Sequence, residues 1–224
     1  VIYKFRAVLL VFSSVGLERA NEQLAAWLRG EKSLPFGPHG EHVPIHLIDY
    51  DDPGRNRCVV TNQWVYRFGP ADVRFDVVGL VNGLPLVIGE AKTPVRAAVT
   101  WFDGAADIHD YYERDAPAMF VPNVFSFATE GRALRYGAVR APLELWGPWR
   151  PEDAPDEGSL SAVRAAVGAL LRPATVLDLL RHFTLFATDR RHRRIKIIGR
   201  YQQVEAANKI VGRVLAGRPR KGLI

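Results

Sequence analysis

Three charged residues stand out in the middle of the chain because the residues around them are mostly apolar. Asp76, Glu90 and Lys92 lie in the string RFDVVGLVNGLPLVIGEAK. Charges on segments that otherwise favour burial are costly unless a partner compensates them. Two carboxylates and an ammonium group are suited to holding Mg²⁺ on a phosphate, while the lysine orients or helps to deprotonate a water. The residue types therefore indicate metal-assisted hydrolysis.

The two carboxylates must be brought together by a β-hairpin. Asn82-Gly83 is a strong turn signal between two apolar strands, Val73–Val81 and residues 84–89. With a three-residue loop at 82–84, Asp76 is expected opposite Glu90, with Cβ atoms ~4.5–5.5 Å apart. A strict two-residue turn would instead put the pair on opposite faces. Glu90 and Lys92 alone are a weak signal, because a charged residue at a strand end often marks where the strand leaves the core.

The rest of the chain predicts an α/β fold, with a mixed sheet flanked by helices and followed by a helical segment. A proline-rich, acidic stretch at 146–158 is expected to be a linker between a domain at 1–150 and a segment at 151–224. Further strands are expected at 45–50, 58–68, 118–128 and 133–136, and helices at 18–28, within 93–112 from Thr93-Pro94, and at 160–171, 174–183 and 201–215.

Composition narrows the class of protein. The 224 residues are 48% hydrophobic and 24% charged, which is close to the average for globular proteins. No apolar run approaches the ~18–20 residues of a membrane span, so no membrane partner is expected. Cys58 is the single cysteine, which favours a reducing cytoplasm. The chain opens on Val1, so we expect a fragment of a longer protein.

The net charge of +6 is unevenly distributed. Residues 181–224 hold 12 of the 30 Lys and Arg residues but only two acidic ones, Asp189 and Glu205. The preceding part holds 18 basic and 22 acidic residues and is therefore weakly acidic. We expect the basic run Arg190 to Arg194 either to contact phosphates or to be a solvated linker.

The segment NQWVYRFGPADVRFDVVGLVNGLPLVIGEAKTP, residues 62–94, closely resembles the nuclease domain of the restriction (R) subunit of type I restriction-modification enzymes. Those subunits carry N-Q, R-P-D, N-G-L-P-L-V and E-x-K strings in this order. The strings IDYDDPGRN and EGRALRYGA resemble the flanking strings of that family, and the resemblance runs from about Asn21 onward.

This resemblance implies the fold and site of the P-D…(D/E)-x-K nucleases. Asp76, Glu90 and Lys92 would then be catalytic, and Asp76 and Glu90 would hold Mg²⁺. The resemblance also implies that the domain cuts unmodified foreign double-stranded DNA within an ATP-driven complex that contains modification and specificity subunits.

Two departures from the family pattern concern residues beside the site. Phe75 stands where the family usually has proline. The family's Q-x-x-x-Y string appears as Asp107 to Tyr111, so the tyrosine is kept and Asp107 replaces glutamine. Tyr111, Asp107 and Gln63 are therefore candidate supporting residues, although we expect Asp107 to face solvent rather than the metal.

The C-terminal string RYQQVEAANKIV resembles the adenine-contacting glutamine motif before the motor domain of these subunits, with Gln203 as the glutamine. The chain has no phosphate-binding G-x-x-x-x-G-K-[ST] loop, so ATP is expected to act only in a full-length protein. A stand-alone nuclease of the same superfamily and a non-catalytic DNA-docking or assembly module on the same fold are the alternatives.

Overall fold

A mixed β-sheet organises the chain. The computed structural model describes residues 12–35, 39–68, 72–96 and 98–217. Within them, five strands follow the order β3-β4-β5-β6-β7, and all neighbours are antiparallel except β5 and β6. Their bounds are β3 Cys58–Tyr66, β4 Val73–Val81, β5 Leu84–Ala91, β6 Phe125–Thr129 and β7 Leu134–Gly137.

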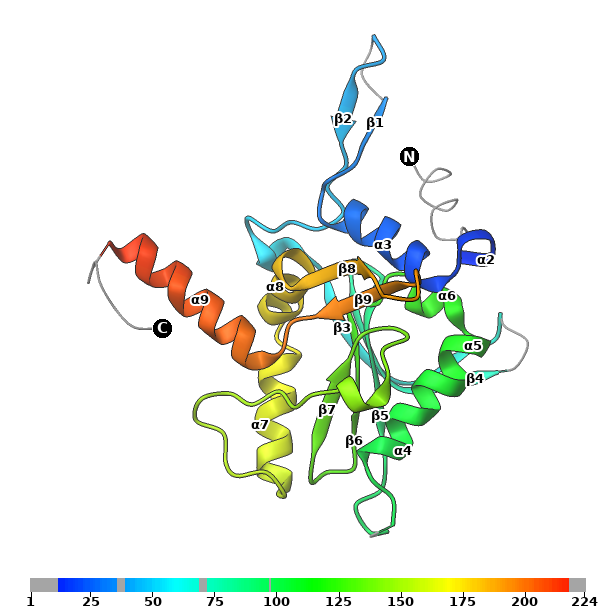
Figure 1. Ribbon diagram of the computed structural model, residues 1–224, viewed down its shortest axis with the longest axis vertical. Coiled ribbons are helices and arrows are strands. Elements are labelled where there is room, and N and C mark those ends of the chain that lie inside the picture. The colour runs from blue at the N-terminus through cyan, green and yellow to red at the C-terminus, as the bar shows by residue number, and fades with distance from the viewer. Residues whose placement is uncertain (1–11, 36–38, 69–71, 97, 218–224) are drawn as a thin grey trace.

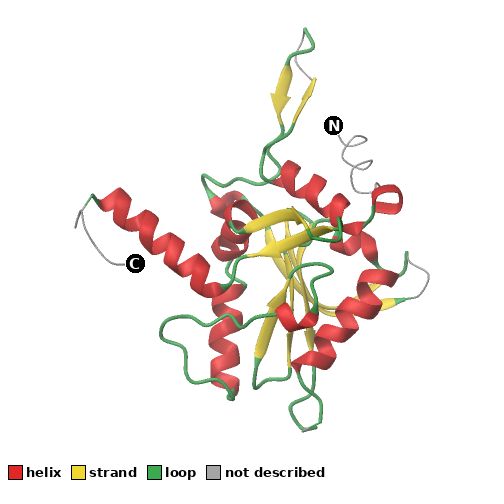
Figure 2. Cartoon of the chain, viewed as in Figure 1, coloured by secondary structure: helices red, strands yellow, loops and turns green. Residues whose placement is uncertain are grey.

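Helices cover both faces of this sheet (Figures 1 and 2). Because parallel strands need a crossover, a helical stretch along one face joins β5 to β6. The crossover consists of α4 (Trp101–Ala106), the π-helix η2 (Asp107–Tyr112), α5 (Glu113–Asp115) and α6 (Pro117–Phe120). The junction of α7 (Leu160–Leu170) and α8 (Pro173–His182) packs near β3, β4 and β5 on the other face.

The amphipathic helix α3 (Leu17–Leu28), preceded by α2 (Phe12–Val15), closes one end of the core. Its buried Leu17, Ala20, Leu24 and Leu28 recur at helical spacing, which gives it one apolar face. Asn21 lies on the same buried side, and its amide donates to the carbonyls of Phe120, Val121 and Asn123 at 3.0, 2.9 and 2.8 Å. Asn21 therefore ties α3 to the α6–β6 connection.

Several expected elements differ from the observed ones. Residues 45–50 form no strand, and the hairpin in that region pairs β1 (Ser33–Pro35) with β2 (His42–Pro44) instead. The helix after β5 begins at Trp101 rather than Thr93, because Thr100 and Asp103 form a capping box there. The start of the expected strand at 118–128 is helix α6. Two short 3₁₀ turns are η1 (Pro53–Arg55) and η3 (Leu143–Leu145).

The segment after residue 158 is not wholly helical. It contains α7, α8 and α9 (Tyr201–Ala216), close to the expected ranges, but also an antiparallel hairpin of β8 (Thr184–Thr188) and β9 (Arg194–Ile198). This hairpin lies beside α3, which contacts β9 (Figure 1). The hairpin was not expected from the sequence, although residues 184–188 and 194–198 contain β-branched residues and are separated by five residues.

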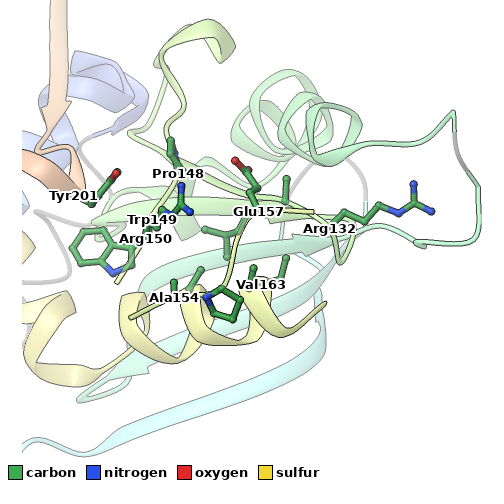
Figure 3. Close-up of a pocket in the computed structure, with 13 residues that line it drawn as sticks. Arg132, Pro148, Trp149, Arg150, Ala154, Glu157, Val163 and Tyr201 are labelled. Carbon is green, nitrogen blue, oxygen red and sulfur yellow. The ribbon is translucent and has the colours of Figure 1, made fainter. Parts of the chain in front are cut away.

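The acidic stretch at 146–158 packs on the domain. Gly147 forms a β-bridge with Tyr136, and Trp149 makes an edge contact with the same tyrosine at 5.6 Å between ring centroids. Arg135 pairs with Glu157. Between this stretch and α7 lies a small cavity of about 80 Å³, which Figure 3 shows together with Trp149, Glu157 and Tyr201.

No single helix among the described residues has the length and apolar composition needed to cross a membrane. In the part of the chain that the structure describes, α7 and α8 taken together, bent by 61°, are the one helix pair that meets those two criteria.

Candidate functional site

A β-bulge sets the register that brings Asp76 to Glu90. The turn holds only Asn82 and Gly83, both with positive φ (51° and 83°), so the expected three-residue loop is wrong. Pairing then shifts between Leu80↔Pro85 and Gly79↔Val87, which leaves Leu86 as an extra residue in β5. The pairing Val77↔Gly89 follows, and its continuation places Asp76 opposite Glu90.

Beyond that point β4 and β5 no longer pair, and Asp76 lies at the divergence. Its Oδ2 accepts the backbone N–H of Ala91 at 3.0 Å, and its Oδ1 accepts Nε2 of Gln63 at 2.9 Å. The backbone of Gln63 has a φ of 52°, in the left-handed region that residues other than glycine seldom adopt. Asp76 therefore joins the edge strand β3 to the carboxyl end of β5.

Glu90 is 5% exposed, and both of its carboxylate oxygens accept hydrogen bonds. Lys92 Nζ donates to Oε1 at 2.8 Å, and the Tyr112 hydroxyl donates to Oε2 at 3.2 Å. Burial raises the pKa of Glu90, and the negative charge of Asp76 raises it further, against the opposing effect of Lys92 and Tyr112. The effect of Asp76 on Glu90 is consistent with the register, which places the two carboxylates near each other.

Lys92 lies between two carboxylates. Besides Glu90, its Nζ contacts Oδ2 of Asp107 on the crossover helix. Burial acts to lower the pKa of Lys92, but the bonds to Asp107 and Glu90 outweigh it and raise the pKa. Lys92 is therefore an ammonium ion in this arrangement. The expectation that Asp107 faces solvent is wrong, because its carboxylate is held by this cation.

The π-helix decides which tyrosine reaches the site. In a π-helix the backbone hydrogen bonds join residues five apart, and the wider turn brings the residue at i+5 much closer to the face of residue i than an α-helix would. Asp107 and Tyr112 are five apart, and both contact the Glu90–Lys92 pair. Tyr111, the candidate supporting residue, is 51% exposed and lies under the guanidinium of Arg114 instead. Sequence reasoning missed Tyr112, since nothing in the pattern indicated a π-helix.

A glycine lets this helix approach the sheet. An added Cβ at Gly104 would lie 3.2 Å from Cγ of Glu90, 3.3 Å from Cβ of Ala128 and 3.5 Å from Cγ of Lys92. These contacts are at or inside ordinary van der Waals distance, so Gly104 is what allows α4 to carry Asp107 to Lys92. Phe75, at the usual proline position, is fully buried and makes edge contacts with Tyr112 and Phe120.

Gln203 lies outside this cluster. It is on the first turn of α9, and its Oε1 accepts the backbone N–H of Arg200 at 2.9 Å. This bond caps the helix and leaves the residue exposed. The structure therefore brings together Gln63, Asp76, Glu90, Lys92 and Asp107 and adds Tyr112.

The carboxylates of Asp76 and Glu90 suit Mg²⁺, which needs few protein ligands, better than a metal ion whose ligands all come from the protein. No group of three or more His, Cys, Asp and Glu side chains suited to a metal gathers in the described part of the chain. Mg²⁺ commonly uses one or two carboxylates and completes its shell with water and substrate phosphate. Asp76 and Glu90, whose charges repel each other, are a pair of that kind.

The observed features define an α/β domain with a carboxylate–lysine site where two strands diverge. The family model described as "Type I restriction enzyme R protein N terminus" matches residues 2–145, and the chain belongs to this family.

Relatives agree with this assignment. The chain is 29% identical over 209 residues to a protein named type I restriction enzyme HindI endonuclease subunit, from Haemophilus influenzae; the match covers 90% of the chain and 20% of that relative. It is 28% identical over 173 residues to a putative type I restriction enzyme MjaVIIIP endonuclease subunit from Methanocaldococcus jannaschii, covering 76% of the chain and 16% of the relative. The chain thus spans about a fifth of the length of these relatives.

Proposed function

We propose that this domain hydrolyses phosphodiester bonds of double-stranded DNA in a Mg²⁺-dependent reaction, as the nuclease part of a type I restriction R subunit. The observation that carries the proposal is the cluster of Asp76, Glu90 and Lys92 at the point where β4 and β5 diverge. The names of the relatives, all endonuclease subunits, support it.

In this proposal Asp76 and Glu90 hold the metal, and Gln63 and Tyr112 orient the two carboxylates through their hydrogen bonds. Bound Mg²⁺ would polarise the scissile phosphate and acidify a coordinated water. Lys92 then orients the attacking water and stabilises the negative charge that develops on the phosphate. Asp107 holds the Lys92 ammonium in place, as its contact with Nζ indicates.

The wider setting belongs to the same proposal. The relatives are about five times as long as this chain, so we propose that the whole protein also contains an ATP-driven motor. We further propose that it works in the cytoplasm, in a complex with modification and specificity subunits. Gln203 would contact adenine of ATP in that protein. Its present role in capping α9 would have to be exchanged for that contact.

The test uses the full-length subunit in its reconstituted complex with Mg²⁺, ATP and supercoiled plasmid carrying an unmodified site. Lys92→Ala is expected to reduce cleavage by about 10²–10³-fold, the usual effect of losing one charge-stabilising group. Lys209→Ala, which removes an exposed lysine on α9, is the matched control and should cut normally.

Wild-type cleavage by Lys92→Ala would remove Lys92 from the mechanism. A wild-type complex that binds and translocates DNA but never nicks it would favour a non-catalytic docking module. Circular dichroism of both variants separates loss of activity from loss of fold.

A further inference from the structure

Arg74 is the one cationic residue in the three strands that carry the two carboxylates and their edge. Within β3, β4 and β5, all of whose residues are described, the other charged side chains are Asp76 and Glu90. Arg74 is exposed, and no hydrogen bond or ion pair joins its side chain to another described residue. Asp72, two residues earlier in the chain, lies 3.8 Å from Arg67 instead. The described part of the chain therefore leaves the guanidinium of Arg74 without a partner.

Arg74 faces the same side of the sheet as Asp76. Residues two apart on a strand point to the same face, with Cα atoms ~6.6–6.8 Å apart. The cross-strand partner of Arg74 is Val65, and Gln63, which donates to Asp76, lies two residues before Val65 on β3. Arg74 and Val65 therefore continue the surface that begins at Asp76 and Gln63.

This surface is the open side of the carboxylate site. Val65 is 42% exposed, and Arg74 beside it is exposed as well. Glu90, in contrast, is covered by α4, which approaches it at Gly104, and by the Tyr112 hydroxyl. Because the helix blocks that approach, a DNA strand bound at the two carboxylates reaches them from the side of Arg74 and Val65.

The charge of the site favours a cation at this place. Its carboxylates are those of Asp76, Glu90 and Asp107. When ionised they carry three negative charges, against the one positive charge of Lys92. One Mg²⁺ would bring this sum to zero, while each phosphate of DNA adds a negative charge. An arginine beside the metal site would therefore attract the phosphate that neighbours the one held by the metal.

We infer that Arg74 binds the phosphate next to the scissile phosphate and thereby positions the DNA strand on the carboxylate site. A guanidinium group can bind two phosphate oxygens at once, so it orients the strand as well as attracting it. Val65 then lies beside the bound strand. This inference rests on the proposed nuclease function, because it names a residue that holds the substrate of that reaction.

The first experiment detects DNA on this surface without relying on cleavage. The photoreactive residue p-benzoylphenylalanine replaces Val65 in the full-length subunit, which is assembled with its complex on DNA carrying an unmodified site. Val60, 67% exposed on the same strand but ~17 Å away, is the matched control position. We expect DNA cross-links from position 65 clearly above those from position 60. Adding Arg74→Gln should lower the yield by about two- to fivefold, the range for an exposed ion pair.

The second experiment measures positioning during cleavage. Arg74→Gln should slow single-turnover plasmid cleavage by about tenfold or more, because a hydrogen bond to a charged group is lost, while ATP hydrolysis stays unchanged. The log–log dependence of the cleavage rate on salt should become shallower by about 0.9, the value for one phosphate contact. Arg74→Lys keeps the charge and should retain the wild-type salt dependence but only part of the rate. Arg164→Gln, which removes an exposed arginine on α7, is the matched control and should change neither quantity.

Three outcomes would overturn this inference and leave the nuclease proposal standing. They are wild-type cleavage by Arg74→Gln, slower cleavage with an unchanged salt slope, and cross-links no stronger from position 65 than from position 60. A wild-type complex that never cuts DNA would instead refute the nuclease proposal and this inference with it.

Discussion

Asp76 lies opposite Glu90 because Leu86 is an extra residue in β5. The two-residue turn at Asn82-Gly83 would pair Asp76 with Gly89, and the bulge shifts that pairing by one position. Shifting a strand by one residue moves its side chains to the other face of the sheet. The bulge therefore decides whether the two carboxylates lie on the same face of the sheet, as the proposed metal site requires.

Tyr112 and Tyr111 offer a matched test of the π-helix. Tyr112→Phe removes the hydroxyl that donates to Glu90, while Tyr111→Phe removes one that lies outside the cluster. A hydrogen bond to a charged group contributes ~1.5–3 kcal/mol, so plasmid cleavage by Tyr112→Phe should fall by at least about tenfold. Tyr111→Phe should cut at the normal rate. The opposite order would mean that the site is organised around Tyr111.

Gly104→Ala should impair the site without the stability gain usual for a helical glycine. Replacing such a glycine by alanine normally stabilises a helix by ~0.5–1 kcal/mol. At Gly168 on α7 an added Cβ meets nothing within 4 Å, so Gly168→Ala should show that gain in urea unfolding. At Gly104 the new methyl would press on Glu90 and Ala128, which should cancel the gain and slow cleavage. Equal stabilisation and full activity in both variants would contradict the close packing of α4.

Asn21 should contribute strongly to stability although it is polar. Its amide donates to three buried carbonyl groups, and Asn21→Ala leaves them without that donor. We expect a loss of ~1–3 kcal/mol in the free energy of unfolding, measured by urea denaturation. Asn208→Ala, which breaks one exposed bond to Asp178, should change stability by less than ~0.5 kcal/mol. Similar values for the two variants would refute a structural role for Asn21.

The buried Glu113 should make stability depend on pH. Burial raises the pKa of Glu113 to about 8, well above its value in the unfolded chain. The folded state therefore holds a proton that the unfolded state releases, so the stabilisation is complete below about pH 4.5 and is lost as the pH rises to about 8. Glu113→Gln should flatten this decline in urea titrations between pH 5 and 8.

Lys196 acts in the adjoining pH range. Burial lowers its pKa to about 7, so above pH 7 the unfolded state binds the extra proton and stability rises with pH. Lys196→Met should abolish that rise while keeping the decline due to Glu113.

For Glu113, the contrary outcome is a decline in stability between pH 5 and 8 that persists in Glu113→Gln. That result would assign the decline to other groups.

The sequence by itself determined the strands around the site and its charged residues. The apolar runs of β4 and β5 and the Asn82-Gly83 turn were readable because they depend on local alternation and on residues that tolerate positive φ. Helices α3, α7, α8 and α9 followed from the spacing of their apolar residues. The resemblance in residues 62–94 indicated the family to which the chain belongs.

Only the tertiary structure decided how these residues meet. The bulge at Leu86, the π-helix that selects Tyr112 and the approach of Asp107 to Lys92 all depend on packing between segments far apart in sequence. The hairpin β8–β9 illustrates the same limit. Its charged Arg194 and Lys196 resemble an exposed polar run, yet Glu22 and the carbonyl of Asn123 hold them inward. A local pattern cannot specify such distant partners, because their energy exists only once the chain has folded.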